Sequence, residues 1–180
     1  MTPAISVTGL TRRYPDQVAL DDVHLTIGDQ TITGLLGRNG AGKTTLLRIL
    51  AGQEFQSSGS VRVLGSSPAE NENVLRSLVL VREDQAYPDF KVRHALRAAS
   101  FCYPNWDAGL ASSLPEDFGL RPGMAIKSLS RGQRSALGIT IGLAARAEVT
   151  LFDEPYAGLD AVARQIFYDR LPPPCSRTWS

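Results

Sequence analysis

The chain has 180 residues, 43% of them hydrophobic, which suits one or two compact domains with an apolar core. Its formal net charge of +1 implies no general affinity for nucleic acid or for an acidic membrane surface. Cys102 and Cys175 form no disulfide or metal-binding pattern, and no run of about 18 apolar residues occurs, so we expect a cytoplasmic protein that does not itself span a membrane.

The N-terminal third shows the alternating and β-branched patterns that are typical of strands. We expect strands over residues 4–10 and 18–27, separated by a turn at residues 14–16, and a further short strand over residues 61–64. Residues 30–36 are rich in β-branched and aliphatic side chains, which predicts a buried strand directly before a glycine-rich segment.

That glycine-rich segment, residues 37–45 (GRNGAGKTT), matches the phosphate-binding P-loop pattern, and a helical composition follows over residues 45–51. The glycines let several backbone N–H groups face one point at the positive end of the helix. Lys43 can then reach the β- and γ-phosphates of a nucleotide, and the Thr44 hydroxyl can bind Mg²⁺. A chance glycine turn is the alternative, which the flanking strand and helix disfavour. The predicted nucleotide-binding residues of this segment are Gly37, Asn39, Gly40, Ala41, Gly42, Lys43, Thr44 and Thr45.

The middle of the chain is predicted to be mostly helical. A strand is expected over residues 78–81, followed by helical segments over residues 88–135 that Pro104, Pro115 and Pro122 break. Residues 95–101 form the best helix there, and Trp106 and Phe118 are most simply core residues.

A second candidate site follows a short apolar run at residues 149–152, which ends in Asp153 and Glu154. A strand buried on both faces has this pattern, and α/β sheets place their ligands at the carboxyl ends of such strands. Alone, the two carboxylates could equally mark a solvated strand end. Paired with the P-loop they predict a Walker B strand, in which Asp153 holds Mg²⁺ and the catalytic Glu154 orients and deprotonates an attacking water.

Three more segments accompany these two motifs in a fixed order: Leu129-Ser130-Arg131-Gly132-Gln133, Gly158-Leu159-Asp160, and Arg13-Tyr14. With them the chain resembles the ABC-type ATPases, the ATP-binding subunits of ABC transporters, from about residue 4 to residue 170. The resemblance implies an α/β P-loop NTPase fold with a mostly parallel core sheet, a small antiparallel β subdomain and a helical signature subdomain. Residues 1–87 and 135–170 would form the catalytic core with the β subdomain, and residues 88–134 the helical subdomain.

The resemblance also assigns roles to residues of this chain. Tyr14 would stack on adenine, and Asp160 belongs to the D-loop. The signature residues Ser130, Arg131, Gly132 and Gln133 would grip the γ-phosphate bound to a second subunit, although Arg131 stands where the family usually has glycine. A glutamine that senses Mg²⁺ in the family corresponds to Glu83 here, with Gln85 two residues later, and both assignments stay open.

The implied function is a subunit that binds Mg·ATP at a dimer interface, hydrolyses it when complete, and drives a separate membrane-spanning subunit from the inner face of the cell membrane. The second ATP-binding subunit is the same chain or a related one, and no nucleic-acid partner is expected. The alternatives are a hydrolysis-deficient ATP-binding module, a truncated gene product, or a soluble ABC-type ATPase acting on ribosomes or in DNA repair.

The tail departs from the family. After a helix expected at Ala161–Arg170, residues 171–180 contain three successive prolines, which can neither continue a helix nor form a central strand. We therefore expect the sheet strand and the switch histidine that the family carries there to be missing, since the two histidines, His24 and His94, both lie far upstream. Central strands without ladder partners would leave this chain poorly soluble and weak or inactive as an ATPase.

Overall fold

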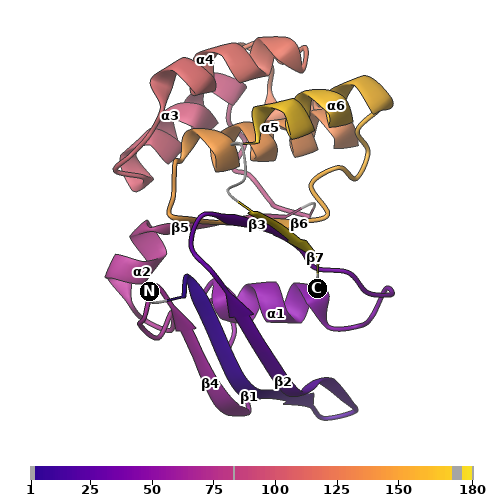
Figure 1. The fold of residues 1–180 in the computed structure, drawn as a ribbon. Coiled ribbons are helices and arrows are strands. Elements are labelled where there is room, and N and C mark those ends of the chain that lie inside the picture. Colours follow the sequence, from indigo (N-terminus) through magenta and orange to yellow (C-terminus); the bar gives the residue numbers. More distant parts are fainter. Residues whose placement is uncertain (1–2, 83, 172–175, 180) are drawn as a thin grey trace. The chain divides into compact units, whose positions relative to one another are not determined.

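The computed structural model describes residues 3–82, 84–171 and 176–179, and the backbone alone for the last four. It divides into two compact units. The first unit comprises residues Met1–Leu75 and Pro172–Ser180, and the second comprises Arg76–Leu171 (Figure 1).

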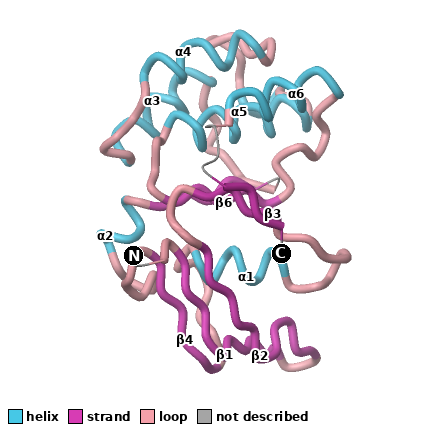
Figure 2. Tube along the Cα trace, in the orientation of Figure 1, coloured by secondary structure: helices cyan, strands magenta, loops and turns pink. Residues whose placement is uncertain are grey.

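The first unit contains a three-stranded antiparallel sheet in the order β2-β1-β4, visible in Figure 2. The strands are β1 (Ile5–Tyr14), β2 (Gln17–Ile27) and β4 (Ser58–Val63), so the strands and the turn expected in this region are confirmed. One face of the sheet is apolar because inward and outward side chains alternate along the strands, except where register shifts interrupt β1 after Val7. Its buried residues are Ile5, Val7, Leu10, Leu20, Val61 and Val63.

The strand before the glycine-rich segment is β3 (Thr31–Gly34), and the helix after it is α1 (Lys43–Leu50). The helix buries Leu46, Ile49 and Leu50, which recur at helical spacing and form its inner face. All four residues of β3 are half-buried, whereas Leu35 and Leu36 lie beyond its end and are exposed. The expectation of a buried strand extending to residue 36 is therefore wrong at its C-terminal end.

The tail supplies a strand, which corrects the expectation that no strand would form there. The backbone of β7 (Ser176–Trp179) pairs in parallel with β3, from Thr31 opposite Ser176 to Gly34 opposite Trp179. Because these four residues include no proline, every one of their backbone N–H groups can join a ladder, and the prolines precede the strand instead of interrupting it. The strand β3 therefore has a ladder partner, and one reason to expect poor solubility is removed.

The second unit contains the parallel pair β5 (Leu78–Arg82) and β6 (Val149–Asp153), both of which were expected. Its helices are α3 (Val92–Cys102), α4 (Ala108–Asp117), the 3-10 turn η1 (Ile126–Ser128), α5 (Arg131–Ala144) and α6 (Ala161–Arg170). A short helix, α2 (Glu72–Arg76), spans the boundary between the two units. Nine of the fourteen residues of α5 are buried, so this helix is the centre of the unit's core.

Side chains from several helices pack around α5. Trp106 and Phe118 are half-buried against this core, as expected. The prediction that Pro115 breaks a helix is wrong, because Pro115 lies inside α4. It occupies the last turn, and the α4 N-terminus is held independently by Asp107, whose carboxylate accepts a hydrogen bond from the Leu110 N–H at 2.9 Å.

Candidate functional site

The P-loop, residues 37–44, connects β3 to α1 in the first unit. Gly40 and Gly42 have positive φ angles of 82° and 87°, and the Ala41 N–H donates to the Arg38 carbonyl at 3.1 Å. A Cβ atom added to Gly42 would lie 2.3 Å from the carbonyl oxygen of Ala19, so both the backbone conformation and the space require glycine there. The sequence motif thus corresponds to a real constraint on the backbone.

Lys43 is the first residue of α1, and its Nζ donates to the carbonyl oxygens of Gly37 and Arg38 at 2.8 and 3.0 Å. These bonds hold the loop curled around the lysine, and among the described residues they engage two of its three N–H donors. Thr44 and Thr45 follow in the first helical turn, where backbone N–H groups have no acceptor within the helix. An ammonium, two hydroxyls and helix-terminal N–H groups thus occur in three consecutive residues at the start of α1, and groups of this kind suit a polyphosphate.

The carboxylates after β6 belong to the second unit. Asp153 is the last residue of β6, half-buried and paired through its backbone with Arg82 of β5. Glu154 is exposed and has a φ angle of 51°, which for a residue other than glycine costs about 1–3 kcal/mol. Its carbonyl accepts a hydrogen bond from the Ala157 N–H at 3.0 Å, so the chain turns sharply at this point. Such local strain is characteristic of functional positions.

The signature segment begins α5 with a capping box. The Ser130 hydroxyl accepts from the Gln133 N–H at 3.2 Å, and the Gln133 side-chain oxygen accepts from the Ser130 N–H at 3.0 Å. Arg131 is the first helical residue and is exposed. Ser130 is therefore the N-cap of α5.

The signature and the D-loop are in contact within the second unit. A Cβ atom at Gly132 would lie 2.4 Å from the carbonyl oxygen of Gly158, and the Ser135 hydroxyl donates to the Ala157 carbonyl at 2.7 Å. Asp160 ends the loop by accepting a hydrogen bond from the Ala163 N–H at 2.8 Å, which caps α6. Sequence reasoning missed Ser135, because a serine inside a helix carries no local signal of a partner 22 residues away.

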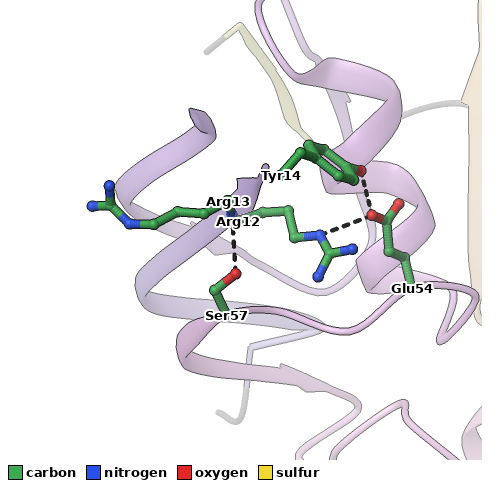
Figure 3. A network of polar contacts seen from close by, with 5 residues as sticks. All are labelled: Arg12, Arg13, Tyr14, Glu54 and Ser57. Carbon is green, nitrogen blue, oxygen red and sulfur yellow. Dashed lines mark hydrogen bonds and ion pairs between the residues drawn. The ribbon is translucent and has the colours of Figure 1, made fainter. Parts of the chain in front are cut away.

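Tyr14 lies at the end of β1 in the first unit, half-buried. Its hydroxyl donates to the carboxylate of Glu54, and the Arg12 guanidinium carbon lies 4.6 Å from the centre of its ring (Figure 3). Sequence reasoning singled out neither Arg12 nor Glu54. The i, i+2 spacing of Arg12 and Tyr14 could have suggested that they share one face of a strand, whereas nothing in the sequence marks Glu54.

Among the remaining predicted residues, Glu83 lies outside the described residues. Gln85 is half-buried, and its N–H donates to the Arg82 carbonyl at 3.3 Å. Within the described part of the chain, no group of three or more His, Cys, Asp or Glu residues could hold a metal ion. A magnesium site does not require such a group, because proteins usually bind Mg²⁺ through one or two carboxylates together with substrate phosphates. No helix among the described residues is long and apolar enough to cross a membrane.

Comparisons with known proteins extend this picture. The family model described as "ABC transporter" matches residues 20–157. The chain is 37% identical over 171 residues to the phosphonates import ATP-binding protein PhnC 1 of Natronomonas pharaonis, which covers 87% of this chain and 71% of the relative. It is 32% identical over 177 residues to the Nod factor export ATP-binding protein I of Ralstonia nicotianae, covering 94% of this chain and 55% of that relative.

Solved structures show the same fold. One described as the structure of an ATP binding subunit of an ABC transporter matches 98% of this chain and 78% of its own with a TM-score of 0.84 and 23% identity. The fold is therefore the P-loop NTPase fold of ABC ATPases, with parallel strand pairs and a small antiparallel sheet. The family model covers residues 20–157 and the relatives are ATP-binding proteins, so the chain belongs to the ABC transporter family, among its ATP-binding subunits.

Proposed function

We propose that this chain binds Mg·ATP and acts as the ATP-binding subunit of an ABC transporter. The observation that carries the proposal is the P-loop, where Gly40 and Gly42 take positive φ angles immediately before Lys43 at the start of α1. The family membership supports the proposal, because the chain matches the ABC transporter family model and relatives that are named ATP-binding proteins.

In this proposal the residues of the P-loop hold the phosphates. Lys43 places its charge on the β- and γ-phosphates, the backbone N–H groups between Gly37 and Thr45 donate to phosphate oxygens, and the Thr44 hydroxyl is a ligand of Mg²⁺. The Tyr14 ring stacks on adenine. The proposal places Tyr14 and the P-loop at one nucleotide because Gly42 packs against Ala19 of β2, the strand that forms a hairpin with β1.

Hydrolysis would use the second unit. Asp153 is a further Mg²⁺ ligand, with Glu83 as a candidate beside it, and Glu154 orients and deprotonates the attacking water. Bound Mg²⁺ neutralises the charge that develops on the transferring phosphoryl group. The signature residues Ser130 to Gln133 would contact the γ-phosphate held by a second subunit, with Asp160 at the same dimer interface.

The partners in this proposal are a second ATP-binding subunit and a separate membrane-spanning subunit, which together place the chain at the inner face of the cell membrane. Of the two relatives, one is named for the import of phosphonates and the other for the export of Nod factor, so the proposal assigns neither a substrate nor a direction of transport. The chain spans 71% and 55% of those two relatives, and the whole protein's activity is part of the proposal.

The test is a calorimetric titration of the purified chain with Mg·ATP. The variant Lys43→Ala should lose most of the ATP affinity, because it removes the side-chain cation that contacts the P-loop carbonyls from the start of α1. Lys91→Ala is the matched control: this lysine is exposed and precedes α3 in the second unit, and its removal should leave affinity unchanged. Tight binding that persists in Lys43→Ala would place the nucleotide elsewhere.

A further inference from the structure

Three side chains from different segments meet at the end of β1. Tyr14 and Arg12 project from the strand, and Glu54 comes from the loop that follows α1 (Figure 3). One carboxylate oxygen of Glu54 accepts from both the Tyr14 hydroxyl and the Arg12 Nε, the latter at 2.9 Å. The adjacent backbone is also tied to this loop, since the Arg13 N–H donates to the Ser57 hydroxyl at 3.0 Å.

This cluster is shielded from solvent more than an ordinary surface ion pair. The side chains of Arg12 and Glu54 are only 24% and 14% exposed. Because water screens such a pair weakly, its hydrogen bonds hold the two side chains in a fixed geometry more firmly than exposed pairs do. The Tyr14 ring is fixed at its hydroxyl by Glu54 and on one face by Arg12, whose guanidinium carbon lies 4.6 Å from the ring centre.

The Glu54 loop is in turn anchored to the helix that starts at the P-loop. The Gly52 N–H donates to the Ile49 carbonyl at 3.0 Å, and the Gln53 N–H donates to the Arg48 carbonyl at 2.9 Å. The residue before Glu54 is thereby attached to the last turn of α1, whose first residue is Lys43. The ring of Tyr14 and the phosphate-binding lysine are therefore positioned by opposite ends of one short helix.

We propose that Arg12 and Glu54 are positioning residues that fix the Tyr14 ring for stacking on the base of a nucleotide, with the base on the ring face opposite Arg12. The inference rests on the proposed function, in which the P-loop holds the phosphates of the same nucleotide. Arg12 occupies one face of the ring, so a planar base reaches Tyr14 only from the other face. The guanidinium, the ring and the base then form a three-layer stack.

The test compares two probes, Mg·ATP and inorganic tripolyphosphate with Mg²⁺, because the second has phosphates and no base. Tyr14→Ala should weaken ATP binding roughly 5- to 150-fold, the range expected for losing one aromatic–base stack, and leave tripolyphosphate binding unchanged. Glu54→Ala should show the same selectivity with a smaller loss, about 3- to 10-fold, because the ring remains but is no longer held. Arg13→Ala is the matched control on the same strand, with an exposed side chain, and should change neither affinity.

Two further variants separate positioning from a merely structural role. Tyr14→Phe keeps the ring and removes only the bond to Glu54, so it should weaken ATP binding selectively even if Glu54→Ala folds poorly. Adding Glu54→Ala to Tyr14→Ala should cause no further loss, because Glu54 acts through the ring. The proposal is overturned if Glu54→Ala weakens both probes equally, if it weakens ATP equally in the Tyr14→Ala background, or if Tyr14→Phe binds ATP like the unchanged protein.

Failure of the proposed function gives a different result. If Lys43→Ala binds both probes as tightly as the unchanged chain does, the P-loop is not the phosphate site. The nucleotide whose base would stack on Tyr14 is then not held there. If Lys43→Ala abolishes binding of both probes while Glu54→Ala and Tyr14→Phe bind ATP normally, the P-loop assignment stands and the positioning role of Glu54 is wrong.

Discussion

The contact between the signature and the D-loop predicts a specific cost for Gly132→Ala. The new Cβ atom would lie 2.4 Å from the carbonyl oxygen of Gly158, about an ångström closer than ordinary van der Waals contact allows. That carbonyl belongs to a turn that the Ser135 hydroxyl holds through Ala157, so the turn cannot retreat without straining a second bond. Overpacking of this kind costs about 1–3 kcal/mol.

The control for this substitution is Gly123→Ala, where an added Cβ meets no atom within 4 Å among the described residues. Both changes restrict the unfolded chain by the same amount, so the difference between the two variants isolates the clash. For a chain of this size 1 kcal/mol corresponds to about 2–4 °C, and Gly132→Ala should therefore melt about 2–12 °C below Gly123→Ala. Thermal denaturation without nucleotide measures this difference, and equal melting temperatures would refute the contact as described.

Three other predictions concern single side chains. Glu154→Gln should slow ATP turnover about 10²- to 10⁴-fold without weakening Mg·ATP binding. A phosphate-release assay measures the turnover and a calorimetric titration measures the binding. Equal turnover rates in the two proteins would exclude Glu154 as the base. Burial raises the pKa of Tyr87 to about 12, and its hydroxyl has no hydrogen-bond partner among the described residues. Tyr87→Phe should therefore raise the free energy of unfolding by about 1 kcal/mol. A loss of stability in this variant would show that the hydroxyl is hydrogen-bonded. The hydrogen bond from the Leu110 N–H, and then Arg146, lower the pKa of Asp107 below 3.8. The difference in free energy of unfolding between the unchanged chain and Asp107→Asn should therefore be complete above pH 3.8 and decline as the pH falls below it. Urea denaturation at several pH values measures this difference, and a difference in midpoints that stays constant with pH would contradict the prediction.

The motifs were the most predictable part of the molecule. Residues 37–45 and Asp153-Glu154 predicted a strand, a glycine loop and a helix, and the end of a second strand, and the structure has these elements. Such motifs are local, because each is a constraint on neighbouring backbone angles or on a strand of five or so residues. Gly42 illustrates this: its φ angle of 87° is a property of the loop itself.

The interactions between distant segments were not predictable from the sequence. Glu54 meets Tyr14 from 40 residues away, and Ser135 meets Ala157 across 22 residues. Neither Ser135 nor Glu54 carries a local sequence signal of its partner, because serine and glutamate are both mostly found on solvated surfaces. The tail shows the opposite error: its three prolines predict that no strand forms, although proline excludes only the residues it occupies, and Ser176–Trp179 pairs with β3.

The central claim is that the P-loop holds the phosphates of ATP. At 19.5 kDa the chain is small enough for residue-by-residue nuclear magnetic resonance of its backbone amides during a titration with Mg·ATP. The account predicts saturable shifts for the amides of Gly40, Ala41, Gly42 and Lys43, with tripolyphosphate shifting the same four. Saturable binding of ATP that leaves these amides unmoved and shifts a group elsewhere in the chain would contradict it.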